Sequence, residues 1–310
     1  MNFLLVSSRF AFARCFMAAV VSISLWCDVV TAAERTLDTA YGLVRINGVP
    51  KRVVTLGETA LDASLTLDAH PLGALAARGG SQVPEYLQEK AGHIELVGSV
   101  REPNLEAVLA LEPDLILATN DLSKQLFDQL SLIAPTVIPK VGSMDDWRAS
   151  FRLYALALDK QAMAEERLKD FDHQVESLRQ SIATGQSATV LRLNPQGPIL
   201  MSAQVFAGQI LASLGFLPNE LAVSLKHRPH SDILSLENLT KADADWIFLA
   251  TLNADGDKAL DEVSGQPVFA QLKAVKDGHV VSVDGQVWSS SAGYMAAERI
   301  LADIAKALAL

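Results

Sequence analysis

Four arginines stand in or beside loops where a ligand could bind, and they define the chemistry that the sequence offers. They are Arg78, Arg101, Arg192 and Arg228. A guanidinium group is a planar, permanently charged donor that pairs with two carboxylate oxygens at once. Four such groups in one cleft would form a basic pocket for an anionic ligand, although each arginine taken alone is equally compatible with a solvated surface position.

Other candidate ligand-binding residues lie in similar loops. Glu58 opens a segment after an expected strand, and His227 stands three positions before His230 in "HRPH". A direct metal site usually needs three or four ligands, so we predict that these imidazoles hydrogen-bond to a chelate and that no protein metal site exists. Trp288 and Tyr294 could supply an aromatic wall, although core packing explains Trp288 as well.

Two stretches of the chain repeat one pattern: "NLEAVLALEPDLILAT" at Asn104–Thr119 and "SLENLTKADADWIFLA" at Ser235–Ala250. Each opens on a residue that is a good helix N-cap, which places Glu106 and Glu237 in the first turn of a helix. Each carboxylate would interact favourably with the positive end of its helix and stabilise it by about 0.3–1 kcal/mol. The pair could also form a two-point electrostatic contact with a basic partner surface.

The elements that must position these residues are short apolar strands alternating with helical segments. The expected strands are Arg52–Leu56, Leu72–Ala76, Asp114–Ala118, Thr136–Ile138, Ala188–Leu193, Asp245–Ala250 and His279–Val283. They are short, bulky or β-branched, and bounded by Gly, Pro or Asp. Helical patterns at Asn104–Leu111 and Phe206–Leu214 lie between them. This alternation predicts parallel sheets covered by helices, with ligands bound beyond the carboxyl ends of the strands.

The middle of the chain carries a longer helical pattern. Apolar residues from Leu168 to Ile182 recur at intervals of three and four, with polar residues between them. A helix over residues 160–184 would extend about 36 Å. We predict an α/β protein of two Rossmann-like lobes, 34–159 and 185–310, with mostly parallel central sheets joined by this single long rigid α-helix. A surface helix within one domain is the alternative.

The N-terminal segment resembles a secretory signal peptide. Arg9 and Arg14 precede an apolar run at Cys15–Trp26, and small residues end at Ala33. We predict that residues 1–33 are removed by cleavage near Ala33, which places the mature protein in the periplasm. Two alternatives to this cleavage are attachment of a lipid to Cys27 and retention of the segment as an anchor helix. The chain has no cysteine outside this segment, so its stability must come from a hydrophobic core.

The composition limits the class of function. Half of the residues are hydrophobic and 20% are charged, which is typical of a folded globular protein, and the formal net charge is −10. An acidic exported protein is a poor candidate for binding nucleic acid. The sequence contains no phosphate-binding loop, no Gly-x-Ser-x-Gly and no His-Glu-x-x-His motif. We therefore expect a binding protein that acts as a monomer, without a cofactor of its own, rather than an enzyme.

Several segments resemble one known family. They are "VPKRVVTLGETALDASLTLDAHPLGALA", "LVGSVREPNLEAVLALEPDLILA", "GQILASLGF", "LSLENLTKADADWIFLA" and "VFAQLKAVKDGHVVSVDGQVWSSSAGYMAAERILADI". Together they resemble the class III periplasmic substrate-binding proteins of iron–siderophore ABC importers, and especially the ferric dicitrate-binding type. The resemblance implies two lobes with a rigid helical hinge. It also implies that Glu106 and Glu237 dock onto a dimeric inner-membrane permease, and that Arg78 and Arg101 contact the ligand.

The ligand that the resemblance implies is a ferric siderophore or ferric citrate. Heme-binding relatives carry a Tyr-Pro pair after the second strand, where this chain has Val83 and Pro84, and Tyr86 is displaced. Heme is therefore disfavoured. Cobalamin remains an alternative, although its neutral rim would not require the arginines. An exported hydrolase is the alternative from a different class of protein.

Overall fold

Two five-stranded β-sheets form the frame of this computed structural model, which describes residues 34–140, 142 and 144–309. The predicted signal peptide, with Cys27 and the cleavage position at Ala33, lies outside these residues. An antiparallel hairpin of β1 (Arg35–Thr39) and β2 (Gly42–Ile46) precedes the first sheet. None of the helices in the described ranges combines the length and the hydropathy needed to cross a membrane.

The first sheet is entirely parallel and belongs to the N-terminal lobe. Its strand order is β5-β4-β3-β6-β7. The strands are β3 (Val53–Leu56), β4 (Gly73–Ala76), β5 (Glu95–Ser99), β6 (Leu115–Ala118) and β7 (Thr136–Val137). The helices are α1 (Glu58–Thr66), α2 (Glu85–Ala91), α3 (Leu105–Ala110), α4 (Lys124–Ser131) and α5 (Trp147–Leu158). β3, β4 and β6 are buried throughout, as expected for strands covered on both faces.

The second sheet belongs to the C-terminal lobe and is mostly parallel. Its order is β10-β8-β11-β12, and β9 pairs with β8 in antiparallel fashion. The strands are β8 (Ser187–Asn194), β9 (Gly197–Leu200), β10 (Leu217–Pro218), β11 (Trp246–Thr251) and β12 (Val280–Asp284). The helices are α7 (Phe206–Ser213), α8 (Glu220–Ser224), α9 (Ala254–Ser264), α10 (Lys273–Asp277) and α11 (Tyr294–Ala307). Shorter helical turns are η1 (Leu236–Ala242), η2 (Phe269–Gln271) and the π-helical η3 (Gln286–Ser290).

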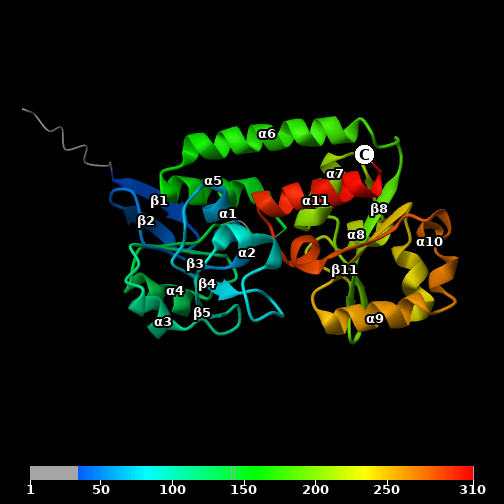
Figure 1. Ribbon diagram of the computed structural model, residues 1–310, viewed down its shortest axis with the longest axis horizontal. Coiled ribbons are helices and arrows are strands. Elements are labelled where there is room, and N and C mark those ends of the chain that lie inside the picture. Colours follow the sequence, from blue (N-terminus) through cyan, green and yellow to red (C-terminus); the bar gives the residue numbers. More distant parts are fainter. Residues whose placement is uncertain (1–33, 141, 143, 310) are drawn as a thin grey trace, which may run out of the picture. The chain divides into compact units, whose positions relative to one another are not determined.

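The helix between the two sheets is α6, Gln161–Arg179. It starts where the sequence predicts but ends about five residues before 184, so its length is about 28 Å rather than 36 Å. Residues 144–184 contain no glycine or proline, so the sequence gives no signal for this earlier end. α6 lies along α5 and α11, which come from different lobes (Figure 1).

The lobes are also joined by direct packing, in addition to the predicted connecting helix. One buried core contains side chains from both lobes. Trp147 of α5 packs edge-to-face on Phe206 of α7, with ring centroids 5.8 Å apart, and on Phe171 of α6 at 5.7 Å. Phe151 of α5 stacks on Tyr294 of α11 at 6.0 Å. Aromatic pairs of this kind stabilise the junction beyond their buried area.

The repeated sequence pattern has the same structural context in both lobes. In the first lobe, α3 leads to β6, and Asp114 before β6 accepts hydrogen bonds from the backbone N–H groups of Lys51 and Arg52, next to β3. In the second lobe, η1 leads to β11, and Asp245 before β11 accepts from the N–H and hydroxyl of Ser187 at the start of β8. Each aspartate therefore fixes the start of the neighbouring strand.

Candidate functional site

Arg192 lies near the carboxyl end of β8, where a parallel sheet offers its ligand-binding edge. Side chains alternate along the strand, so Arg192 shares a face with Val190, which belongs to the core that spans both lobes. Leu191 and Leu193 point to the opposite face and pack in a separate core of the C-terminal lobe. The strand thus directs a half-buried guanidinium toward the lobe boundary.

Arg78 follows β4 of the N-terminal lobe and lies close enough to Arg192 for their charges to interact. Burial, together with the nearby positive charge of Arg78, lowers the pKa of the Arg192 guanidinium. The buried Arg192 Nε atom has no hydrogen-bond partner, and no ion pair to Arg192 exists within the residues that the structure describes. Arg78 and Arg192, one from each lobe, therefore form a pair of like charges close enough to interact (the arginine pair), and no ion pair compensates Arg192 among the described residues.

Glu58 stands beside this pair at the first turn of α1. Gly57 precedes it with φ of 145°, and a Cβ atom there would lie 2.6 Å from the Thr119 side chain, so a larger residue would displace the turn. Glu58 Oε1 accepts a hydrogen bond of 2.8 Å from the Arg78 N–H, and Oε2 accepts one of 3.3 Å from the Ser291 hydroxyl. Burial raises the pKa of Glu58, against the lowering effect of Arg78. Both carboxylate oxygens are therefore already bound by protein groups.

The other two arginines are placed differently. Arg101 is exposed on the loop after β5, an edge strand of the first sheet. Arg228 is exposed and pairs with Asp232 through a 2.6 Å contact between Nη2 and Oδ1. Its charge is therefore already compensated by a neighbour in the sequence. Among the described residues, Arg78 is the arginine whose charge acts on Arg192.

His227 lines a groove between the lobes. The groove has a volume of about 660 Å³, which is within the range of small-molecule sites. Its lining residues are Met144, Asp145, Asp146, Ala203, Gln204, Gln209, Ala212, Lys226 and His227. Gln209 Nε2 donates a 2.9 Å hydrogen bond to the Asp145 carbonyl and so bridges the lobes at this groove. The charges here are mixed, unlike those of the arginine pair.

Trp288 and Tyr294 do not form the predicted aromatic wall. Trp288 is 1% exposed, stacks on Phe248 at 4.4 Å and donates its Nε1–H to Asp303 Oδ2 at 2.9 Å. Tyr294 is 3% exposed and packs against Phe151 at the lobe junction. Side chains buried to this extent have little surface to offer a ligand, so these two residues belong to the core.

Glu106 and Glu237 are both exposed and occupy matching positions. Each is the second residue of a short helix whose N-cap side chain accepts a backbone N–H: Asn104 caps α3, and Ser235 caps η1. An exposed leucine accompanies each glutamate, Leu109 at 58% and Leu236 at 40% exposure. Each lobe therefore presents one carboxylate beside an apolar side chain, a combination that suits contact with a partner protein.

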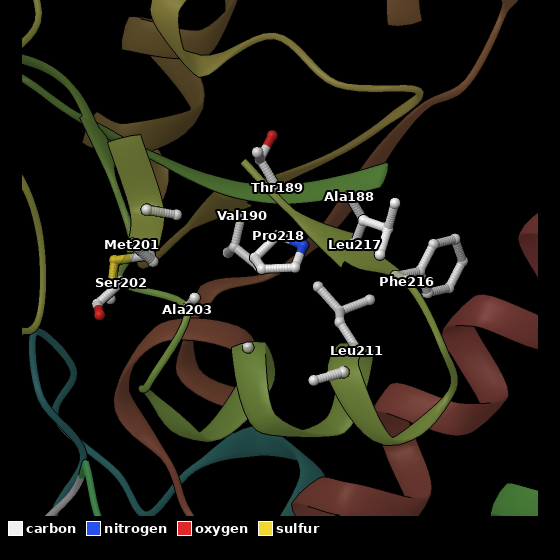
Figure 2. A pocket seen from close by; sticks show the side chains of 13 residues that line it. Ala188, Thr189, Val190, Met201, Ser202, Ala203, Leu211, Phe216, Leu217 and Pro218 are labelled. Carbon is white, nitrogen blue, oxygen red and sulfur yellow. The ribbon is translucent and has the colours of Figure 1, made fainter. Parts of the chain in front are cut away.

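A separate cavity lies inside the C-terminal lobe (Figure 2). Its volume is about 90 Å³, and its lining is mostly apolar, including Val190, Met201, Leu211 and Phe216. Its lining residues come mainly from β8, from residues 201–203 after β9, from α7 and from β10. The lining contains no charged side chain, so this cavity does not suit an anionic chelate.

Sequence reasoning missed three residues at the lobe boundary. Asp62 of α1 is fully buried and accepts hydrogen bonds from the N–H groups of Met295 and Ala296 at the start of α11, at 3.1 and 3.0 Å. Gln286 and Ser291 bind the Arg78 carbonyl and Glu58 respectively. The sequence offers a signal for Asp62 alone, because a charged residue among the apolar positions of a helix needs hydrogen-bond partners in the core.

The fold and this site define a two-lobed binding protein of the periplasmic type. The family model described as "Periplasmic binding protein" matches residues 53–287, and the chain belongs to this family. The match spans both sheets and the α6 connection between them. The predicted resemblance to the class III proteins is confirmed.

Relatives within the family are iron-chelate receptors. The chain is 32% identical over 288 residues to the probable siderophore-binding lipoprotein YfiY of Bacillus subtilis (strain 168), covering 89% of this chain and 88% of that protein. It is 25% identical over 281 residues to the Fe(3+) dicitrate-binding periplasmic protein FecB of Escherichia coli (strain K12), with coverage of 89% and 90%. The crystal structure of Staphylococcus aureus SirA complexed with staphyloferrin B superimposes with a TM-score of 0.80 at 28% identity, covering 89% of this chain and 98% of that one.

Proposed function

We propose that this protein captures an anionic ferric chelate, a ferric siderophore or ferric citrate, between its lobes and delivers it to an ABC importer. Membership of the periplasmic binding protein family and the names of the relatives support capture and delivery. The family is one of binding proteins, and we assign no catalytic step to the site.

The observation that carries the proposal is the half-buried Arg192 guanidinium, whose Nε has no hydrogen-bond partner and which lies within range of the Arg78 charge from the other lobe. Holding two guanidinium groups together and partly burying one of them is unfavourable unless an anion completes the site. A carboxylate of the chelate would accept hydrogen bonds from both groups and relieve their repulsion. The repulsion lowers the stability of the ligand-free protein, and binding of the anion removes it.

The chemistry of the pair favours a carboxylate-bearing chelate. Guanidinium groups bind carboxylates through two parallel, charge-assisted N–H···O bonds, and a neutral corrin rim offers no carboxylate for such a pair. One relative binds ferric dicitrate by name, and the chelate in the SirA complex is staphyloferrin B. We place ferric citrate and citrate-type siderophores ahead of catecholate chelates, heme and cobalamin.

Delivery would use Glu106 and Glu237 as the contacts with the permease. Their exposure, their matching positions in the two lobes and the exposed leucine beside each support this role. A permease built from two equivalent subunits would meet one glutamate with each subunit, and the binding protein would act as a monomer. Export to the periplasm, with cleavage near Ala33, belongs to the same proposal, and attachment through Cys27 is the alternative.

The proposal is tested by native mass spectrometry of the mature protein against ferric citrate, a catecholate siderophore, heme and cobalamin. We expect a one-to-one complex with ferric citrate or a citrate-type siderophore, together with quenching of tryptophan fluorescence. Exclusive binding of heme or cobalamin would overturn the assigned ligand class. Turnover of ester substrates without chelate binding would instead support the hydrolase alternative.

A further inference from the structure

The backbone of Arg78 is held from both sides, although its side chain is exposed. Its N–H donates to Glu58 Oε1 at 2.8 Å within the N-terminal lobe. Its carbonyl accepts a 2.6 Å hydrogen bond from Nε2 of Gln286, which belongs to the C-terminal lobe and lies 208 positions further along the chain. The two peptide groups that flank the Arg78 Cα are therefore both held, one from within the N-terminal lobe and one from across the lobe boundary.

Gln286 is well suited to hold another residue in place. It is 8% exposed, and its own N–H donates to Asp284 Oδ1 at 2.8 Å. It begins the π-helix η3 directly after β12, and π-helical turns occur mostly at functional sites. Burial restricts the rotamers of its side chain, so the bond to Arg78 is made by a fixed group and not by a mobile surface residue.

The same C-terminal segment also holds Arg78 indirectly. Ser291, just after η3, donates its hydroxyl to Glu58 Oε2 at 3.3 Å, while Oε1 of that glutamate holds the Arg78 N–H. Segment 286–291 thus acts on the peptide groups on both sides of Arg78, directly through Gln286 and indirectly through Ser291 and Glu58.

The loop needs such support because its own sequence is permissive. Gly79 and Gly80 follow Arg78, and Gly79 has φ of 77°, a conformation that glycine adopts readily. A loop with two glycines has high conformational entropy when it is not held. Fixing the backbone before the ligand arrives lowers the entropy lost on binding and so strengthens it.

We propose that Gln286 is a positioning residue for chelate binding, which fixes the Arg78 backbone from the opposite lobe and so orients the Arg78 side chain for the ligand. The inference rests on the proposed function, because it requires the Arg78 guanidinium to contact the chelate. It goes further by making affinity depend on a residue that does not itself touch the ligand. Because Gln286 and Arg78 belong to different lobes, the position of Arg78 depends on how the two lobes are placed.

A double-mutant cycle tests this role, since Arg78→Ala removes the guanidinium but keeps the carbonyl that Gln286 holds. The variants are Gln286→Met, which keeps length and loses the amide donor, Arg78→Ala, and both together. Affinity for ferric citrate and for ferric staphyloferrin B is measured by fluorescence quenching. We expect Gln286→Met to weaken binding about fivefold in the wild-type background and to have no further effect in the Arg78→Ala background.

Equal losses in the two backgrounds would overturn the inference, because Gln286 would then act independently of Arg78. If Arg78→Ala leaves affinity unchanged, or if neither chelate binds, the proposed function fails instead. Hydrogen exchange of the ligand-free protein provides a second readout that needs no chelate. Gln286→Met should speed amide exchange at residues 78–82 without lowering the melting temperature, and unchanged exchange there would contradict a positioning role.

Discussion

At the scale of single residues, the proposed chemistry of the site depends on Arg78 and Arg192. We expect Arg192→Ala to weaken chelate binding by about 1–3 kcal/mol, the range for hydrogen bonds to charged groups. Arg192→Lys should recover only part of this loss, because it restores the charge without the planar fork. Calorimetric titration with ferric citrate measures both variants. Arg45→Ala, an exposed arginine on β2, is the control, and equal affinities of wild type and Arg192→Ala would remove the arginine pair from the site.

Asp62 gives a second prediction, about stability and pH. Burial raises its pKa to about 6, although hydrogen bonds from Ala296, Met295, Tyr86 and Thr66 act in the opposite direction. The folded protein therefore keeps this proton above pH 4, where the unfolded chain has released it. The protonated carboxyl therefore stabilises the folded state fully below the pKa of the unfolded chain. This contribution, about 3 kcal/mol in total, is lost as the pH rises from that value through about 6.

Unfolding in urea at several pH values measures this effect. The free energy of unfolding of wild type relative to Asp62→Asn should fall by about 3 kcal/mol between pH 4 and pH 7. Asp261→Asn, at an exposed position on α9, is the control and should show no such trend. A wild type that gains stability relative to Asp62→Asn over the same range would show that the hydrogen bonds outweigh burial.

Residue type alone separated some site residues from core residues and failed for others. Arg78 and Arg192 are predicted to bind ligand because a charged side chain next to an apolar strand needs a reason to be there, and this role stays a prediction. Trp288 and Tyr294 could not, because an aromatic residue near a loop has the same sequence pattern whether it faces a ligand or the core. Gln286 was missed because its role depends on a contact across 208 positions.

At the scale of elements, the buried parallel strands were the most predictable part of the fold. Val53–Leu56 is apolar apart from Thr55, Leu115–Ala118 is apolar throughout, and the structure places strands there to within a residue of the prediction. β5 was missed because it is an edge strand with exposed residues, so its apolar pattern is weak. The β1–β2 hairpin, partly exposed on both strands, was missed for the same reason.

The capped helices α3 and η1 lead to a prediction about transport. Glu106→Ala combined with Glu237→Ala should abolish chelate uptake by cells and leave chelate affinity unchanged, because both side chains are exposed and lie outside the arginine pair. Uptake of radioactive iron and calorimetric titration measure the two quantities separately. Glu166→Ala with Glu176→Ala, two exposed glutamates on α6, form the matched control. Wild-type uptake by the Glu106 and Glu237 variant would exclude the docking role.

At the scale of the whole molecule, the junction between the lobes is a packed core and not a lone connecting helix. The aromatic contacts of Trp147 with Phe206 and of Phe151 with Tyr294 join α5 to helices of the other lobe. Asp62 adds a buried polar contact by accepting from the N-terminus of α11. The sequence predicted a connecting helix correctly, but packing between distant segments leaves no local pattern and could not be predicted.

This junction predicts a small closing movement on ligand binding. A wide opening would expose the aromatic side chains, at a cost of about 25 cal/mol for each Å² of apolar surface. X-ray scattering with and without ferric citrate should give nearly equal radii of gyration. A rotation of the lobes by tens of degrees would contradict this prediction.

The central claim is that an anionic ferric chelate binds between the lobes at Arg78 and Arg192. The most direct test is a crystal structure of the mature protein with ferric citrate, in which the anomalous signal of iron locates the chelate. We expect one iron peak at the lobe boundary, with chelate carboxylates hydrogen-bonded to both guanidinium groups. An iron peak in the groove of Asp145 and His227, or anywhere else away from the arginine pair, would contradict the account.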